Sequence, residues 1–169
     1  MLPFKGLQFP NLPYFMDGKV SITESSAIHR YCAKKWCPEL LNLDDAESYA
    51  KAEMMWGVVA DAKSFITMQC YSEFGNKNIL ATKAIERVEL LARALSENKY
   101  LAGSKLCCAD FAFVELVEFI EFLSDGNVFE KYPVLMKYRN SIFDLPGLKE
   151  YIGKRDYLTF NNKVAKINN

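Results

Sequence analysis

The pattern of apolar and polar positions changes character near residue 23. Before that point, prolines and the Asp17-Gly18 pair interrupt short apolar stretches, and the segment from Lys19 to Thr23 alternates polar with β-branched residues. Such alternation is typical of a half-buried strand, and Asp-Gly is a strong signal for a two-residue hairpin turn. The sequence therefore predicts a β-hairpin with its turn at Asp17-Gly18.

From Glu24 onward the apolar positions recur with a helical period. The expected organisation is a hairpin plus helix in residues 1–36, a linker at 37–43, and an α-helical domain in 44–169 with five or so helices and a tail. The helical domain is expected to contain a long helix from Asp44-Asp45 that breaks at residues 75–78, and then helices at 79–95, 107–123 and 134–143 and a short one after Pro146-Gly147. Residues 107–123 are apolar almost all round, which indicates a buried central helix.

Composition excludes several classes of function. Lys+Arg and Asp+Glu both count 21 in the 169 residues, so there is no net basic charge to suggest a nucleic-acid partner. No apolar run approaches the roughly 20 residues of a membrane span, and a membrane partner is not expected. A single histidine and the lack of any C-x-x-C pair argue against a metal site. The odd set of five cysteines fits a cytoplasmic protein with reduced thiols, each expected to be a small buried apolar residue.

Two short motifs near the N-terminus could hold a ligand. The Leu12-Pro13 bond could be cis and so present backbone groups to a ligand, or it could be an ordinary trans turn. Glu24-Ser25 stands at a strand–helix junction, where free backbone N–H groups and the helix dipole favour an anion. The alternative for Glu24-Ser25 is plain capping of the helix.

Three further positions have both a chemical and a structural interpretation. Asp61 interrupts a mostly apolar helix, so it either faces solvent or pairs across an interface. Tyr71 could project into a cleft, although tyrosines usually pack with the hydroxyl at the surface. Asp110, three residues after Cys107, can reach back to a backbone amide as half of a capping box, which is a folding device rather than chemistry.

Taken together, these motifs resemble a known family. The segment from Phe9 to Gly18 (FPNLPYFMDG), followed by Ile22 to Tyr31 (ITESSAIHRY), resembles the glutathione-binding domain of cytosolic glutathione transferases, closest to the mu class with sigma as a near neighbour. Residues 100–111 (YLAGSKLCCADF) resemble the turn and capping box of the family's central helix, and residues 129–135 and 145–151 continue the likeness. The resemblance implies a mainly α fold, with part of a thioredoxin-like α/β lobe followed by an all-α bundle.

The resemblance also assigns glutathione contacts, residue by residue. Leu12 precedes the family's cis-proline, here Pro13, and its backbone would pair with the cysteinyl part of glutathione, with Asn11 in the same loop. Glu24 and Ser25 match the pair that holds the γ-glutamyl end. The mu class usually has glutamine where this chain has Glu24, while other classes accept glutamate.

Two more positions carry roles in the family. Asp61 matches an aspartate that reaches across a homodimer to the partner's γ-glutamyl ammonium group. Tyr71 matches a tyrosine that donates a hydrogen bond in the pocket for the electrophile. The implied partners are therefore a second copy of the chain and a small-molecule electrophile.

The implied activity is conjugation of the glutathione thiolate to electrophilic small molecules, a detoxification reaction with glutathione as co-substrate. The family's N-terminal strand–helix–strand segment, which carries the catalytic tyrosine or serine, has no counterpart in this sequence, so no catalytic residue is assigned. We therefore expect little or no conjugation by this chain. The alternative is a noncatalytic dimerisation or scaffold module. Retention of Glu24, Ser25 and Asp61 favours the enzyme, whereas the missing segment favours the scaffold.

Overall fold

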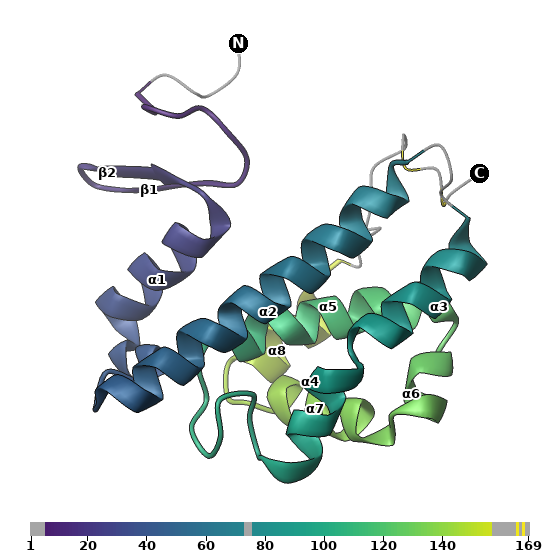
Figure 1. The fold of residues 1–169 in the computed structure, drawn as a ribbon. Coiled ribbons are helices and arrows are strands. Elements are labelled where there is room, and N and C mark those ends of the chain that lie inside the picture. Colours follow the sequence, from purple (N-terminus) through teal and green to yellow (C-terminus); the bar gives the residue numbers. More distant parts are fainter. Residues whose placement is uncertain (1–5, 73–75, 157–164, 166, 168–169) are drawn as a thin grey trace.

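The computed structural model describes residues 6–72, 76–156, 165 and 167. A small N-terminal lobe stands beside a larger helical body, and the long helix α2 runs from one to the other (Figure 1). In chain order the elements are β1 (Tyr14–Asp17), β2 (Val20–Thr23), α1 (Ser25–Trp36), η1 (Pro38–Leu41), α2 (Ala46–Cys70), α3 (Lys77–Arg87), α4 (Glu89–Glu97), α5 (Cys108–Ser124), α6 (Asn127–Lys131), α7 (Pro133–Phe143) and α8 (Leu148–Lys154).

The predicted hairpin is confirmed, but its turn is one residue later than expected. β1 and β2 pair antiparallel with Asp17 opposite Val20, which leaves Gly18 and Lys19 as the two turn residues. Gly18 has a φ of 59°, and a glycine at the first central position suits a tight hairpin turn. Asp17 therefore belongs to the strand, where its carboxylate is available to α1.

Helix α1 stabilises the hairpin from one side. The Tyr31 hydroxyl donates a 2.8 Å hydrogen bond to Asp17, and the Lys35 ammonium pairs with the same carboxylate. Phe15 packs against the rings of Tyr31 and Trp36. A lone two-stranded hairpin is marginal in water, so this packing on α1 contributes to the stability of the hairpin.

The helical body is built around α5, which contacts α1, α2, α3, α6 and α7. Phe113, Val117 and Ile120 are fully buried there, which confirms the prediction of a central apolar helix. The 25-residue α2 begins where the acidic pair predicted, because the Asp45 side chain accepts a 2.8 Å hydrogen bond from the Ser48 N–H. The short helix η1 lies within the expected linker, and the domain boundary at 37–43 stays a prediction.

The predicted helix at 79–95 is wrong as a single element. It divides at Val88 into α3 and α4, although no proline or glycine is present. The two halves pack on different partners, α3 on α5 and α4 on α7, and Val88 is completely buried at the junction. Tertiary packing therefore overrides a continuous amphipathic pattern.

The helix boundaries near residue 76 and residue 127 also differ from the sequence prediction. α3 begins at Lys77 because the Asn76 side chain accepts hydrogen bonds from the N–H groups of Asn78 and Ile79, at 3.0 and 3.2 Å. Gly75, expected as part of the break, lies outside the described residues, as does most of the expected tail. The five-residue helix α6 was not predicted, because it is too short to show a period.

A buried carboxylate joins the start of α5 to α7. Asp110 is completely buried and accepts hydrogen bonds from the N–H groups of Leu101 and Cys107, at 2.9 and 2.8 Å, and from the Tyr138 hydroxyl at 2.7 Å. The expected capping box is therefore confirmed. Burial, with Asp110 adding to the effect, raises the pKa of Tyr138 and raises the pKa of the Cys107 thiol to about 12.

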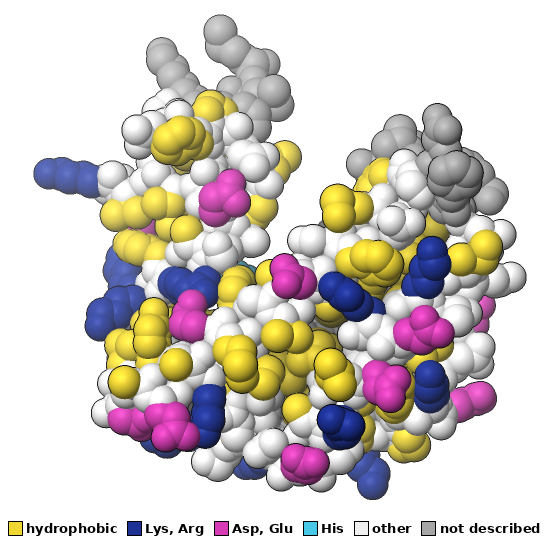
Figure 2. Space-filling view, in the orientation of Figure 1, with side chains coloured by type: hydrophobic (Ala, Val, Ile, Leu, Met, Phe, Trp, Pro, Cys, Tyr) yellow, Lys and Arg dark blue, Asp and Glu magenta, His cyan; other side chains and the backbone are white. Residues whose placement is uncertain are grey.

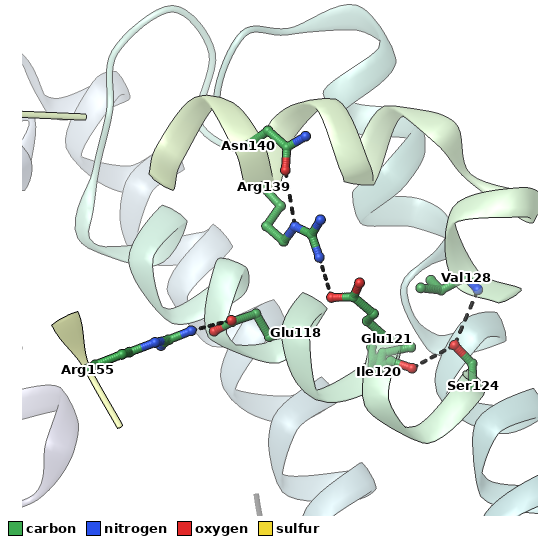
Figure 3. Close-up of polar contacts among 8 residues, drawn as sticks. All are labelled: Glu118, Ile120, Glu121, Ser124, Val128, Arg139, Asn140 and Arg155. Atoms are coloured by element: carbon green, nitrogen blue, oxygen red, sulfur yellow. Dashed lines mark hydrogen bonds and ion pairs between the residues drawn. The ribbon is translucent and has the colours of Figure 1, made fainter. Parts of the chain in front are cut away.

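Farther along α5, its acidic residues meet arginines of other elements (Figure 3). Glu118 pairs with Arg155, at the end of α8, and Glu121 pairs with Arg139 of α7. The Ser124 hydroxyl accepts a 3.3 Å hydrogen bond from the N–H of Val128, which ties α5 to α6. These contacts neutralise charge on a helix that is otherwise surrounded by apolar side chains.

Candidate functional site

A cleft of about 420 Å³ lies between the start of α1, the middle and later part of α2, and α5. Figure 2 shows a hollow between the N-terminal lobe and the far part of α2. The lining residues are Ser25, His29, Trp56, Val59, Ala60, Lys63, Ser64, Thr67, Met68, Ala112 and Glu115. One of the residues assigned to glutathione, Ser25, is therefore placed on the wall of the cleft.

The start of α1 has an unusual geometry. Glu24, the residue before the helix, has φ 70° and ψ 113°, a conformation that residues with a side chain rarely adopt. No side-chain hydrogen bond caps α1, and its first turn holds no acidic residue. The plain capping interpretation of Glu24-Ser25 is therefore wrong. Both side chains are exposed, beside backbone N–H groups that favour an anion.

The cleft walls combine an aromatic surface with charge. His29 lies edge-on to Trp56 with 5.1 Å between ring centroids. Lys63 of α2 pairs with Glu115 of α5 at 2.6 Å. Burial lowers the pKa of His29, against an opposing effect of the Glu115 carboxylate, and so favours the neutral imidazole. The cleft can thus offer an apolar wall, a neutral imidazole and an ion pair to a ligand.

The loop before β1 has the geometry that the resemblance implied. The Leu12-Pro13 peptide bond is cis. The Leu12 side chain is 68% exposed, and its backbone N–H donates a 2.9 Å hydrogen bond to the Asn11 side chain. Asn11 and Leu12 are both exposed, so this hydrogen bond lies at the surface of the lobe.

Asp61 and Tyr71 lie on α2 and at its end, outside the set of described residues that line the cleft. Asp61 is exposed and shares a helix face with Met54, Val58 and Met68, because these positions follow one another at intervals of four, three and seven residues. Tyr71 is 38% exposed, and its N–H bonds to the Met68 carbonyl at 3.3 Å. The structure therefore brings only Met68 of this face to the edge of the cleft.

A family model described as glutathione S-transferase, C-terminal domain, matches residues 61–155. A glutathione S-transferase of Dirofilaria immitis is 30% identical over 155 residues, which are 88% of this chain and 73% of that protein. The chain belongs to the glutathione S-transferase family. A class-mu 26 kDa glutathione S-transferase isozyme of Schistosoma mansoni is 29% identical over 160 residues, 90% of this chain and 69% of that protein.

Solved structures agree with the sequence relatives. The crystal structure of the glutathione S-transferase Blo t 8 superposes with a TM-score of 0.80 at 28% identity, over 96% of this chain and 78% of that one. The mu-like resemblance and the mainly α fold with a partial thioredoxin-like lobe are thereby confirmed. None of the described helices is long and apolar enough to cross a membrane. The described residues also contain no cluster of three or more His, Cys, Asp or Glu side chains suited to a metal ion.

Sequence reasoning missed most of the cleft wall in this glutathione S-transferase. It used the single histidine, His29, only to argue against a metal site and assigned no role to Trp56, Lys63 or Glu115. A signal was present: Trp56, Val59, Lys63 and Thr67 recur at intervals of three and four along α2, which places them on one helix face. That helix face carries both polar and apolar side chains, so a search for apolar helix faces does not detect it.

Proposed function

We propose that the chain binds glutathione, with the γ-glutamyl end at the start of α1. The observation that carries this proposal is the strained backbone of Glu24 beside an exposed Ser25 on the cleft wall. A residue in such a conformation costs about 1–3 kcal/mol and is found mainly where function requires it. The family relationship supplies the ligand class.

The chemistry of the γ-glutamyl group suits this junction. Its carboxylate would accept hydrogen bonds from the Ser25 hydroxyl and from first-turn N–H groups, where the helix dipole favours negative charge. Its ammonium would face the Glu24 carboxylate. In a homodimer the ammonium would also meet Asp61 of the partner subunit, a role taken from the family resemblance.

The remainder of glutathione would extend along the loop before β1. The cysteinyl backbone would bond to Leu12 in place of the Asn11 side chain, next to Pro13. The thiol would then stand at the cleft, whose Trp56 and Val59 offer an apolar surface to an electrophile. Tyr71 would donate a hydrogen bond to the electrophile in the assembled enzyme.

We propose conjugation of the glutathione thiolate to electrophilic small molecules as the family-level activity. Lowering the pKa of a thiol from about 8.5 needs a positioned donor or a positive field. None of the residues matched to the family supplies that donor, so we expect little or no conjugation of a chloronitrobenzene by the 169 residues on their own. Fast turnover would refute that expectation and leave the binding proposal intact.

A dimerisation or scaffold role is the second candidate, and one observation favours it. Met54, Val58 and Met68 are 54%, 42% and 65% exposed on the face of α2 that carries Asp61. Exposed apolar side chains that follow one helix face mark an interface. A homodimer through this face is compatible with either function, so only ligand binding separates the two.

The test is a thermal-shift titration of the chain with glutathione. A ligand that binds the folded state raises the melting temperature once its concentration exceeds the Kd. We expect a dose-dependent rise that is lost in Ser25→Ala and kept in Ser21→Ala, which changes an exposed serine of the same lobe outside the cleft lining. A cooperatively melting chain with no shift would contradict the proposal and favour the scaffold.

A further inference from the structure

A second pocket, of about 460 Å³, lies between α1, η1 and the start of α5. Its walls are almost entirely apolar, and the only lining residue shared with the cleft is His29. The lining residues are Ile28, His29, Cys32, Ala33, Trp36, Cys37, Leu40, Cys108 and Phe111. The volume falls within the range of about 300–1,000 Å³ that is usual for small-molecule sites.

Thiols from three different segments meet in this pocket. Cys32 lies on α1, Cys37 lies between α1 and η1, and Cys108 is the first residue of α5. All three are free thiols and partly exposed, whereas Cys70 and Cys107 are completely buried. The expectation that every cysteine is a buried apolar residue is therefore wrong for the three pocket thiols.

The walls select the kind of molecule that can reach these thiols. Trp36, Leu40 and Phe111 offer apolar surface, and no acidic or basic side chain lines the pocket among the described residues other than the imidazole of His29. Arg30, a cation whose charge acts on Cys108, is itself paired with Glu53 at 2.5 Å. An apolar molecule gains from leaving water here, while a charged one would lose hydration without a partner.

We propose that this pocket captures apolar α,β-unsaturated carbonyl compounds by covalent addition of a pocket thiol. The thiolate sulfur forms a bond to the β-carbon, the carbon–carbon π bond breaks, and its electron pair passes to the enolate. The α-carbon then takes a proton from water, and the proton lost by the thiol returns to the solvent. The sum is addition of S–H across the double bond, with no oxidant or reductant.

This capture is independent of the glutathione proposal. Here the protein thiol itself is the nucleophile, and the adduct stays on the chain. Burial raises the pKa of the Cys108 thiol, with Arg30 opposing it, so the fraction of adduct at Cys108 should rise with pH. The addition of the pocket thiol is therefore measured in buffer without glutathione. A negative result then contradicts the thiol proposal and says nothing about glutathione binding.

The test compares two maleimides with the same reactive group, N-methylmaleimide and N-hexylmaleimide. Rates of adduct formation are followed by intact-protein mass spectrometry, located by peptide mapping, and normalised to N-acetylcysteine. Burial of only two methylene groups of the hexyl chain raises the affinity of the reagent for the pocket about tenfold. We therefore expect the hexyl reagent to be favoured at least about tenfold, with adducts at Cys32, Cys37 or Cys108.

A matched pair of leucine variants separates pocket binding from simple exposure. Leu40→Ser removes an apolar side chain from the pocket wall. It should abolish the preference for N-hexylmaleimide while leaving the rate of reaction with N-methylmaleimide nearly unchanged. Leu43→Ser, which changes a 49% exposed leucine outside the pocket lining, should keep the preference. Equal normalised rates for both reagents in the wild-type chain, or adducts mainly at His29, Cys70 or Cys107, would overturn the proposal. Thermal melts of each variant confirm that the comparison is between folded proteins.

Discussion

Replacing Glu24 tests whether its backbone conformation is maintained for a ligand. At φ 70° and ψ 113° the Cβ of any ordinary residue is crowded, and glycine has none. Relief of such strain is worth about 1–3 kcal/mol. Glycine also increases the conformational freedom of the unfolded chain, which lowers the stability of the folded state by about 0.4–1 kcal/mol. We therefore expect Glu24→Gly to be more stable than Glu24→Ala by about 1 kcal/mol.

The comparison with alanine isolates the backbone contribution. Both variants lose the same carboxylate, so any difference between them reports the conformation at residue 24. For a chain of this size 1 kcal/mol corresponds to about 2–4 °C in melting temperature, which circular dichroism at 222 nm resolves. A glycine variant that melts at or below the alanine variant would refute the assignment of strain.

The same two proteins test the ligand role. Without the Glu24 carboxylate, the γ-glutamyl ammonium group loses its partner at this junction, so both variants should show a smaller glutathione-induced thermal shift. Glu24→Gln, which retains a hydrogen-bonding oxygen, should keep most of the shift. If the glycine variant is stabilised and its glutathione response is unchanged, the strain exists but serves no binding purpose.

Three further outcomes are expected. Tyr138→Phe removes the 2.7 Å hydrogen bond to buried Asp110 and should lower the unfolding free energy by about 1.5–3 kcal/mol, measured by denaturant titration; an unchanged midpoint would contradict the network. Burial lowers the pKa of His29 in the folded state, so near pH 6 the unfolded chain binds more protons than the folded chain, and stability should fall as the pH drops below about 6.5. His29→Gln should flatten this pH dependence in thermal melts. An equal loss of stability in both proteins would show that His29 is not its cause. Val58→Glu places a charge on the exposed face of α2 that carries Asp61, so in analytical ultracentrifugation this variant should sediment as a monomer rather than a dimer. Tyr49→Glu places the same charge on another face of α2 and should leave the dimer intact. Equal sedimentation of the two variants would exclude the Asp61 face as the interface.

The sequence predicted those parts of the fold that depend on neighbouring residues. The alternation after Lys19 located the hairpin. Asp45 located the start of α2, because its side chain accepts a hydrogen bond from Ser48, only three positions along the chain. The division at Val88 could not be read from the chain. It follows from the separate partners of α3 and α4, which are distant in sequence.

For the candidate site, the resemblance assigned glutathione contacts to Glu24 and Ser25, and that assignment stays a prediction. The positive φ of Glu24 and the uncapped helix are features of three-dimensional geometry that the sequence does not show. The pairing of Lys63 with Glu115 joins residues 52 positions apart, and no local pattern announces it. The pocket thiols were missed for the same reason, since Cys108 lines the same pocket as Cys32 and Cys37 only when α5 packs on α1.

The Asp110 carboxylate has a consequence for how the chain is organised. Its three donors are 9, 3 and 28 residues away, all between Leu101 and Tyr138. Short loops close at little entropic cost, so this cluster can form from one contiguous stretch of chain. The N-terminal lobe supplies none of these donors. The buried polar network at the centre of the helical body is therefore local to residues 101–138 and is complete without a contribution from the N-terminal lobe.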